Sequence, residues 1–141
     1  KEKEEVEIIL NLPDEFCSLA NKDLPRSAKP FLNYLSRRGI HKEQIIKWKI
    51  GYCTEGIYKN RVIIPSFNKD GRVNYFVARS ITDDWQKYKN PPASKDIIFN
   101  ELYVDWEQDI IIVEGIFDAI RAGNGIPILG STIREGGKCQ N

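Results

Sequence analysis

The apolar positions of this chain follow a helical spacing first and an extended spacing later. Residues 31–38 and 41–48 each carry apolar side chains at helical spacing, and Gly39 separates them as a helix stop. Lys and Arg occupy many of the other positions in both segments. The pattern therefore predicts a short helical hairpin with basic faces.

A β-hairpin is predicted after residue 49. Residues 61–64 read Arg-Val-Ile-Ile, and Val73, Tyr75 and Val77 alternate with other residues further along. Between them, residues 68–71 read Asn-Lys-Asp-Gly, which is typical of a tight turn. Strand, turn and strand in this order predict an antiparallel pair.

The last part of the chain alternates between strand and helix signals. Residues 110–113 are an apolar run that predicts a buried strand, residues 116–122 predict a helix, and residues 126–129 predict a second strand. This order favours a βαβ unit with parallel strands. We therefore expect an α+β chain, with a helical and hairpin subdomain over residues 1–105 and a partial parallel α/β unit over residues 106–141.

The remaining segments carry weaker signals. Residues 1–23 are expected to form a helix, or a strand that leads into a helix, with an acidic face. Residues 24–30 contain two prolines, which resist helix continuation and predict a linker. Residues 82–96 are polar and predict a loop, and residues 97–106 predict a short amphipathic segment.

The composition is that of one domain, or of one domain with an accessory piece. The chain has 141 residues, of which 41% are hydrophobic. No apolar run approaches the roughly 18 residues that a membrane span needs, and the charged start does not resemble a signal peptide. Cys17, Cys53 and Cys139 have no zinc-binding spacing, and the single His41 cannot build a metal site alone. We therefore expect a reduced, cytoplasmic setting and no membrane partner.

The formal net charge of +1 hides blocks of opposite sign. Lys and Arg dominate residues 26–49 and 59–95, whereas residues 1–23 and 96–118 are acidic. These blocks are either the solvated faces of an ordinary domain or a basic surface for phosphates beside an acidic cluster for a cation.

Glu114 and Asp118 form the candidate catalytic and metal-binding pair. Glu114 ends the predicted strand at the edge where parallel α/β sheets bind ligands, and Gly115 leaves room for one. Asp118 is one helical turn further on, so its carboxylate returns to the same side. Two such carboxylates suit Mg²⁺ or Mn²⁺ together with water and substrate phosphates. The same pair at a helix start also fits a capping and helix-dipole role.

The segment VEGIFDAIRAGNGIPILGST, residues 113–132, resembles the opening of a Toprim domain, the metal-binding α/β module of primases, topoisomerases and some nucleases. Three earlier segments resemble DnaG-type bacterial and phage primases. They read YLSRRGIHKEQIIKWKIGYCT, RVIIPSFNKDGRVNYFVARSI and QKYKNPPASKDIIFNELY. The four segments stand in the family's order over residues 31–132, and the shortened helical lead-in favours a phage or mobile element as the source.

The resemblance implies roles for seven residues. Glu114 and Asp118 match the catalytic, metal-binding acids of the family. The positions that line the family's nucleic-acid groove correspond to Arg38, Arg61, Arg79, Lys87 and Asn90. Among these, Arg61 matches the arginine that opens the family's hairpin. From their position among basic residues, Trp85 and Tyr88 either stack on unpaired bases or pack in the core.

The implied activity is that of a DNA primase, which joins ribonucleoside triphosphates into an RNA primer on single-stranded DNA. The implied cofactor is Mg²⁺ or Mn²⁺ without zinc in this segment, and the implied partners include a replicative helicase in cis or in trans. The chain departs from the family at Val77-Ala78 and Pro91-Pro92, and no second acidic motif appears before Asn141. We therefore expect this chain alone to be weak or inactive, and to be marginally stable or to associate through an open sheet edge.

Two other interpretations stay open at this point. The chain could be a fragment of another Toprim enzyme, such as a topoisomerase or a nuclease. It could also be a non-catalytic Toprim module that binds nucleic acid or a helicase. A topoisomerase needs a nucleophilic tyrosine, which no motif here identifies, and the intact Glu114 argues against a loss of activity.

Overall fold

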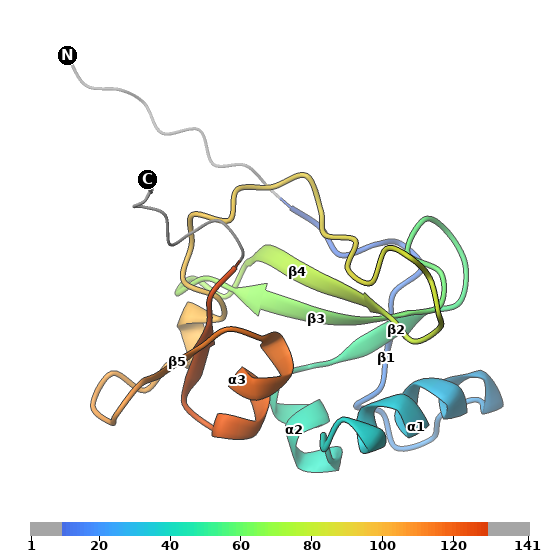
Figure 1. The fold of residues 1–141 in the computed structure, drawn as a ribbon, viewed down its shortest axis with the longest axis horizontal. Helices are drawn as coiled ribbons and strands as arrows, with labels where there is room; N and C mark the ends of the chain where they lie inside the picture. The colour runs from blue at the N-terminus through green and yellow to red at the C-terminus, as the bar shows by residue number, and fades with distance from the viewer. Residues whose placement is uncertain (1–9, 130–141) are drawn as a thin grey trace.

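The computed structural model describes residues 10–129, which fold into two sheets and three α-helices (Figure 1). A four-stranded antiparallel sheet has the order β1-β2-β3-β4, and a two-stranded parallel sheet pairs β5 with β6. In the described residues, no helix has the length and apolar character needed to cross a membrane. In chain order the elements are β1 Cys17–Ser18, η1 Arg26–Ala28, α1 Lys29–Arg37, α2 Lys42–Lys47, β2 Gly51–Cys53, β3 Arg61–Phe67, β4 Val73–Ser80, η2 Glu101–Tyr103, β5 Ile111–Val113, α3 Ile116–Ala122 and β6 Gly125–Pro127.

The β3–β4 hairpin forms where the sequence predicts it. The strands pair antiparallel, with Arg61 opposite Ser80 at the open end. At the turn, the side-chain oxygen of Asn68 accepts hydrogen bonds from the backbone N–H groups two and four residues later. Gly71 takes a φ of 83°, a conformation that glycine adopts without strain. The strand continues through Pro65, which lies beyond the end of β2, so its missing N–H removes no ladder hydrogen bond.

Helices α1 and α2 occupy the two segments with helical spacing. Gly39 follows α1 with a φ of 80°, as the stop signal predicts. The backbone N–H of His41 donates to the Gln44 side chain at 2.7 Å, which stabilises the start of α2. The linker predicted for residues 24–30 is wrong from residue 26 onward, where η1 and the start of α1 lie. Pro30 causes no break because proline is well tolerated in the first helical turn.

The helix expected within residues 1–23 does not form in its described part, residues 10–23. This part contains the short strand β1, which pairs with β2 and adds an edge to the sheet. Leu19, directly after β1, is buried in the core, so tertiary packing outweighs the local pattern. Residues 1–9 lie outside the described part of the chain.

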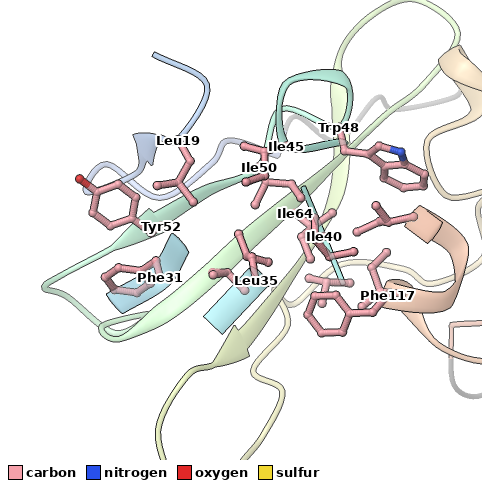
Figure 2. Close-up of a cluster of buried hydrophobic side chains, with 14 of the residues drawn as sticks. Leu19, Phe31, Leu35, Ile40, Ile45, Trp48, Ile50, Tyr52, Ile64 and Phe117 are labelled. Atoms are coloured by element: carbon pink, nitrogen blue, oxygen red, sulfur yellow. The ribbon is translucent and has the colours of Figure 1, made fainter. Parts of the chain in front are cut away.

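Both faces of the antiparallel sheet are covered. Figure 2 shows Leu35 of α1, Ile64 of β3 and Phe117 of α3 in one core. This core includes residues from both sides of residue 105, and the domain boundary predicted there stays a prediction. The opposite face carries a smaller cluster of Cys53, Tyr58, Ile63, Phe76 and Ala78. Burial on both faces explains why the hairpin lacks a strict alternation of polar and apolar residues.

The βαβ unit follows its prediction in element order. Strands β5 and β6 pair in parallel, with Ile112 opposite Ile126, and α3 connects them. The predicted burial of β5 is wrong, because Ile111 is 46% exposed and Ile112 is 60% exposed. Parallel strands are normally covered on both faces and flanked by further strands. Among residues 10–129, β5 pairs only with β6.

Candidate functional site

Glu114 stands between β5 and α3, at the carboxyl end of the strand (Figure 1). The carbonyl of Gly115, the N-cap of α3, accepts a helical hydrogen bond from the Ala119 N–H at 3.1 Å. The side chain of Glu114 is exposed, and no hydrogen bond or ion pair ties it to another of residues 10–129. Its carboxylate is therefore available to a ligand.

A pocket of about 340 Å³ joins Glu114 to the hairpin subdomain. Val77 of β4 and Ile116 of α3 contribute to its apolar walls. Its volume and mixed lining are typical of a site for a small ligand. The polar and charged side chains that line it come from both parts of the chain: Tyr88, Asn90, Lys95 and Glu114.

Asp118 lies in the first turn of α3 and does not line this pocket. Its carboxylate is ion-paired with the guanidinium of Arg121, which also donates to the Arg38 carbonyl. Within residues 10–129, no group of three or more His, Cys, Asp or Glu side chains could hold a metal ion. The structure thus places Glu114 and Asn90 in the lining of one pocket, whereas the carboxylate of Asp118 is paired with the guanidinium of Arg121. Their joint metal site stays a prediction.

Three arginines surround the ring of Tyr34. The guanidinium carbon of Arg79 lies 5.7 Å from the ring centre, and those of Arg37 and Arg38 each lie 5.8 Å from it. Arg38 also lies 4.4 Å from the ring centre of Phe117 in α3. Each contact is favourable by itself, but the three cations repel one another. The arrangement therefore favours a bound anion, and we call Arg37, Arg38, Arg79 and Tyr34 the arginine cluster.

Two buried polar atoms of the arginine cluster, the hydroxyl of Tyr34 and Nε of Arg79, have no hydrogen-bond partner among the described residues. Such atoms mark places where water or a ligand completes a site. Arg79 also lies 5.3 Å from the ring centre of Tyr88, which connects the cluster to the pocket. Burial raises the pKa of the Tyr88 phenol, and the nearby charges of Arg79 and Arg38 oppose that rise.

Arg61 points into the protein, contrary to the predicted contact with nucleic acid. It is 3% exposed. Its guanidinium donates to the carbonyls of Gln86 at 2.8 Å, Lys87 at 3.1 Å and Ala78 at 3.3 Å, and lies 3.5 Å from the Asp84 carboxylate. The protein itself occupies these donors, so Arg61 holds the loop after β4 against the hairpin.

Lys87 and Asn90 lie in this same loop. The side chain of Lys87 is exposed, while its carbonyl accepts a hydrogen bond from the Ser80 N–H at 2.9 Å. Asn90 lines the pocket, and its Oδ1 accepts from the Ala78 N–H at 3.4 Å. Core packing is the wrong interpretation for Trp85, whose side chain is 89% exposed.

Sequence reasoning missed two residues of this region. Lys95 lines the pocket with Glu114, and none of the described residues is hydrogen-bonded or ion-paired to its ammonium group. It lies in a polar loop, where no local pattern indicates which residues face the pocket. Arg37 had a signal, because it forms a basic pair with Arg38 just before Gly39.

Curated proteins similar to this chain are DNA primases. A DNA primase of Halalkalibacterium halodurans is 27% identical over 161 aligned positions, covering 79% of this chain and 27% of that protein. The DNA primase of Enterobacteria phage T4 is 30% identical over 150 positions, covering 92% of this chain and 41% of that protein. The chain thus spans less than half the length of these relatives. A scan against protein-family models finds no match.

Solved structures of DnaG primases share the fold. The DnaG primase catalytic domain bound to ssDNA gives a TM-score of 0.66 at 19% identity, over 79% of this chain and 51% of that one. The zinc-binding and RNA polymerase domains of Aquifex aeolicus primase give 0.61 at 25% identity, over 79% and 38%. The RNA polymerase domain of Mycobacterium tuberculosis DnaG in complex with double-stranded DNA gives 0.65 at 17% identity, over 78% and 50%. The predicted α+β fold is confirmed.

Proposed function

We propose that this chain, which is a segment of the catalytic core of a DnaG-type DNA primase, contributes to RNA primer synthesis on single-stranded DNA. The observation that carries the proposal is the shared pocket, which is lined by Asn90 of the loop after β4 and by Glu114 of the βαβ unit. Phosphoryl transfer needs a cation ligand beside groups that hold the reacting strand and nucleotide. The relatives are DNA primases, so a topoisomerase, a nuclease or a purely binding module is not favoured.

Arg38, Arg79 and Lys87 are proposed to contact the phosphates of the template or primer. The convergence of cations on Tyr34 and the unpartnered Nε of Arg79 support this role for the arginine cluster. Similar structures contain single-stranded or double-stranded DNA. Binding through phosphates releases counterions, so we expect it to weaken steeply with salt and to depend little on sequence. Asn90 is proposed to hydrogen-bond a phosphate or the sugar edge at the pocket.

Glu114 is proposed as the ligand of a divalent cation, Mg²⁺ or Mn²⁺. Its exposed carboxylate has no partner among the described residues and lies beside a cavity, which fits a hard cation. Asp118 gives one carboxylate oxygen, Oδ1, to Arg121, and the arginine charge opposes the binding of a cation there. One or two carboxylates suffice for Mg²⁺ when water and substrate phosphates supply the other ligands. When bound, the cation would neutralise charge that develops on the transferred phosphoryl group.

The family further supports ribonucleoside triphosphates as substrates and a replicative helicase as a partner. It also supports a bacterial cytoplasm as the location and a phage or mobile element as the source. The protein's own part in the chemistry is to position phosphates with the arginine cluster and Lys87 and to hold charge at Glu114. Because no group of three or more His, Cys, Asp or Glu side chains lies together among residues 10–129, we expect residues 1–141 alone to be weakly active or inactive.

The cation site is tested by titrating Mn²⁺ and following the paramagnetic broadening of NMR signals near the pocket. We expect broadening in the wild type and its loss in Glu114→Gln. Glu107→Gln, an exposed acid outside the pocket, is the matched control and should behave as wild type. Equal broadening in the wild type and Glu114→Gln would remove Glu114 from the cation site.

The phosphate contacts are tested by anisotropy of a labelled DNA single strand at increasing salt. We expect Arg79→Ala with Lys87→Ala to weaken binding. We also expect a shallower slope of log Kd against log salt concentration, by the amount that corresponds to about two lost phosphate contacts. The matched control is Lys42→Ala with Lys69→Ala, which removes two exposed charges from α2 and from the hairpin turn. Unchanged affinity in the first double variant would exclude this groove.

A further inference from the structure

Trp85 is the most exposed large apolar side chain among the described residues, at 89%. The other two tryptophans are more protected, Trp48 at 5% and Trp106 at 56% exposed. An indole ring buries a large apolar area when it finds a partner surface. A tryptophan left almost fully in solvent is therefore informative when the backbone around it is held in place.

The loop around Trp85 is held by Arg61, through backbone carbonyls after Trp85 and through the side chain of Asp84 before it. Buried Arg61 donates to the carbonyls of Gln86 and Lys87 and pairs with the carboxylate of Asp84. Asp84 in turn accepts a hydrogen bond from the Gln86 N–H at 2.8 Å. The loop therefore keeps its shape while the indole points into solvent. A loop of this kind presents a side chain at low entropic cost to an incoming partner.

The surroundings of Trp85 favour an uncharged, flat partner. The loop between β2 and β3 lies beside the loop after β4 (Figure 1). It presents Ile57, which is 71% exposed and whose carbonyl accepts a hydrogen bond from the Lys89 ammonium at 3.3 Å. The exposed carboxylate of Asp83 is next but one to Trp85 and disfavours a phosphate directly at the ring. The exposed Lys87, two residues after Trp85, can hold a phosphate further along.

We propose, on the basis of the proposed function, that Trp85 is a stacking platform for one unpaired base of the nucleic-acid strand held by Arg79 and Lys87. The base stacks on the indole outside the pocket, while the strand's phosphates follow the cations toward the arginine cluster. Stacking on aromatic side chains tolerates any base sequence. Arg61 holds the loop that carries the ring.

The first experiment titrates an oligothymidylate single strand into the 141-residue chain and follows both DNA anisotropy and tryptophan fluorescence. We expect Trp85→Ala to weaken binding about five- to hundredfold and Trp85→Phe to weaken it less, since phenylalanine keeps a ring. We also expect DNA to quench the wild-type fluorescence and to leave Trp85→Phe largely unquenched. The control Trp106→Phe should bind and be quenched as wild type. Substitution at Trp85 should not affect folding, because its side chain makes little buried contact.

The second experiment separates stacking from any indirect effect by removing one base at a time from the DNA strand. An abasic site at the stacked position should weaken binding to wild type and have no further effect on Trp85→Ala. The proposal would be overturned if the abasic site weakened DNA binding equally in wild type and Trp85→Ala, or if Trp85→Ala bound DNA with wild-type affinity. Wild-type affinity in Trp85→Ala is the result expected if Trp85 contacts a protein partner instead of DNA. If Arg79→Ala with Lys87→Ala loses DNA affinity while Trp85→Ala does not, the phosphate contacts are supported and the stacking role of Trp85 is contradicted. If the wild type binds no DNA strand, both proposals are contradicted.

Discussion

Replacing Arg61 with alanine should destabilise the chain, because this guanidinium connects β3 to the loop after β4. The side chain is 3% exposed and makes hydrogen bonds to the carbonyls of Gln86, Lys87 and Ala78. If Arg61 instead served to contact nucleic acid, its removal would leave folding stability almost unchanged. Stability therefore distinguishes the two roles.

The size of the loss depends on which carbonyls keep another partner. The Lys87 carbonyl still accepts from the Ser80 N–H, and the Ala78 carbonyl still accepts from the Lys89 N–H, each at 2.9 Å. Only the carbonyl of Gln86 loses the 2.8 Å bond without a second protein donor among the described hydrogen bonds. A hydrogen bond to a charged group contributes about 1.5–3 kcal/mol, and the two shared bonds add less. The half-exposed Asp84 regains water, so no buried charge is stranded.

We therefore expect Arg61→Ala to lose about 2–4 kcal/mol of unfolding free energy. Urea unfolding followed by circular dichroism measures it. With a slope of about 2 kcal/mol per molar urea, the midpoint should fall by about 1–2 M. Arg61→Lys should lie in between, because one ammonium group cannot reproduce the forked guanidinium contacts. Limited trypsin digestion should also cleave faster after Lys87 and Lys89.

The matched control is Lys69→Ala, which removes an exposed charge at the hairpin turn and should change stability by less than about 0.5 kcal/mol. An Arg61→Ala variant with the midpoint of the wild type would refute the structural role. Together with a loss of DNA binding, that result would restore Arg61 to the nucleic-acid groove.

Three further predictions concern the ion pair of Asp118, the exposed strand β5 and the buried thiol of Cys53. Arg121→Ala should raise Mn²⁺ affinity by up to about fivefold in an NMR titration, because an exposed ion pair with Asp118 contributes about 0.2–1 kcal/mol; unchanged affinity would show that Asp118 does not bind the ion. Ile112→Ser should reduce self-association in sedimentation velocity without lowering stability, since Ile112 is 60% exposed on β5; unchanged association would place the contact elsewhere. Burial raises the pKa of the Cys53 thiol from 9.0 to about 12, so the unfolded thiol ionises first and the stability it contributes falls as pH rises from about 9 toward 12. Urea midpoints at pH 8 and 10.5 should therefore differ more in wild type than in Cys53→Ala, and equal differences would contradict the shift.

The sequence by itself determined the elements whose signals are local. The Asn-Lys-Asp-Gly turn fixed the β3–β4 hairpin, because Asn68 accepts backbone hydrogen bonds within four residues and Gly71 takes a positive φ. Gly39 ended α1 for the same kind of reason. The position of Glu114 between a strand and a helix was also readable, since the apolar run and the helical spacing meet there.

Only the tertiary structure decided where the side chains of these elements point and what they meet. Arg61 opens a strand in a basic segment and reads as a surface cation, yet it is buried because three carbonyls converge on it. Lys95 joins Glu114 only because the loop after β4 folds over the βαβ unit. The exposure of β5 is set by which elements pack against it, and among the described residues β6 is its only strand partner. Turn and helix signals act through atoms a few residues apart, whereas burial and charge pairing depend on segments that the chain brings together only when the core closes.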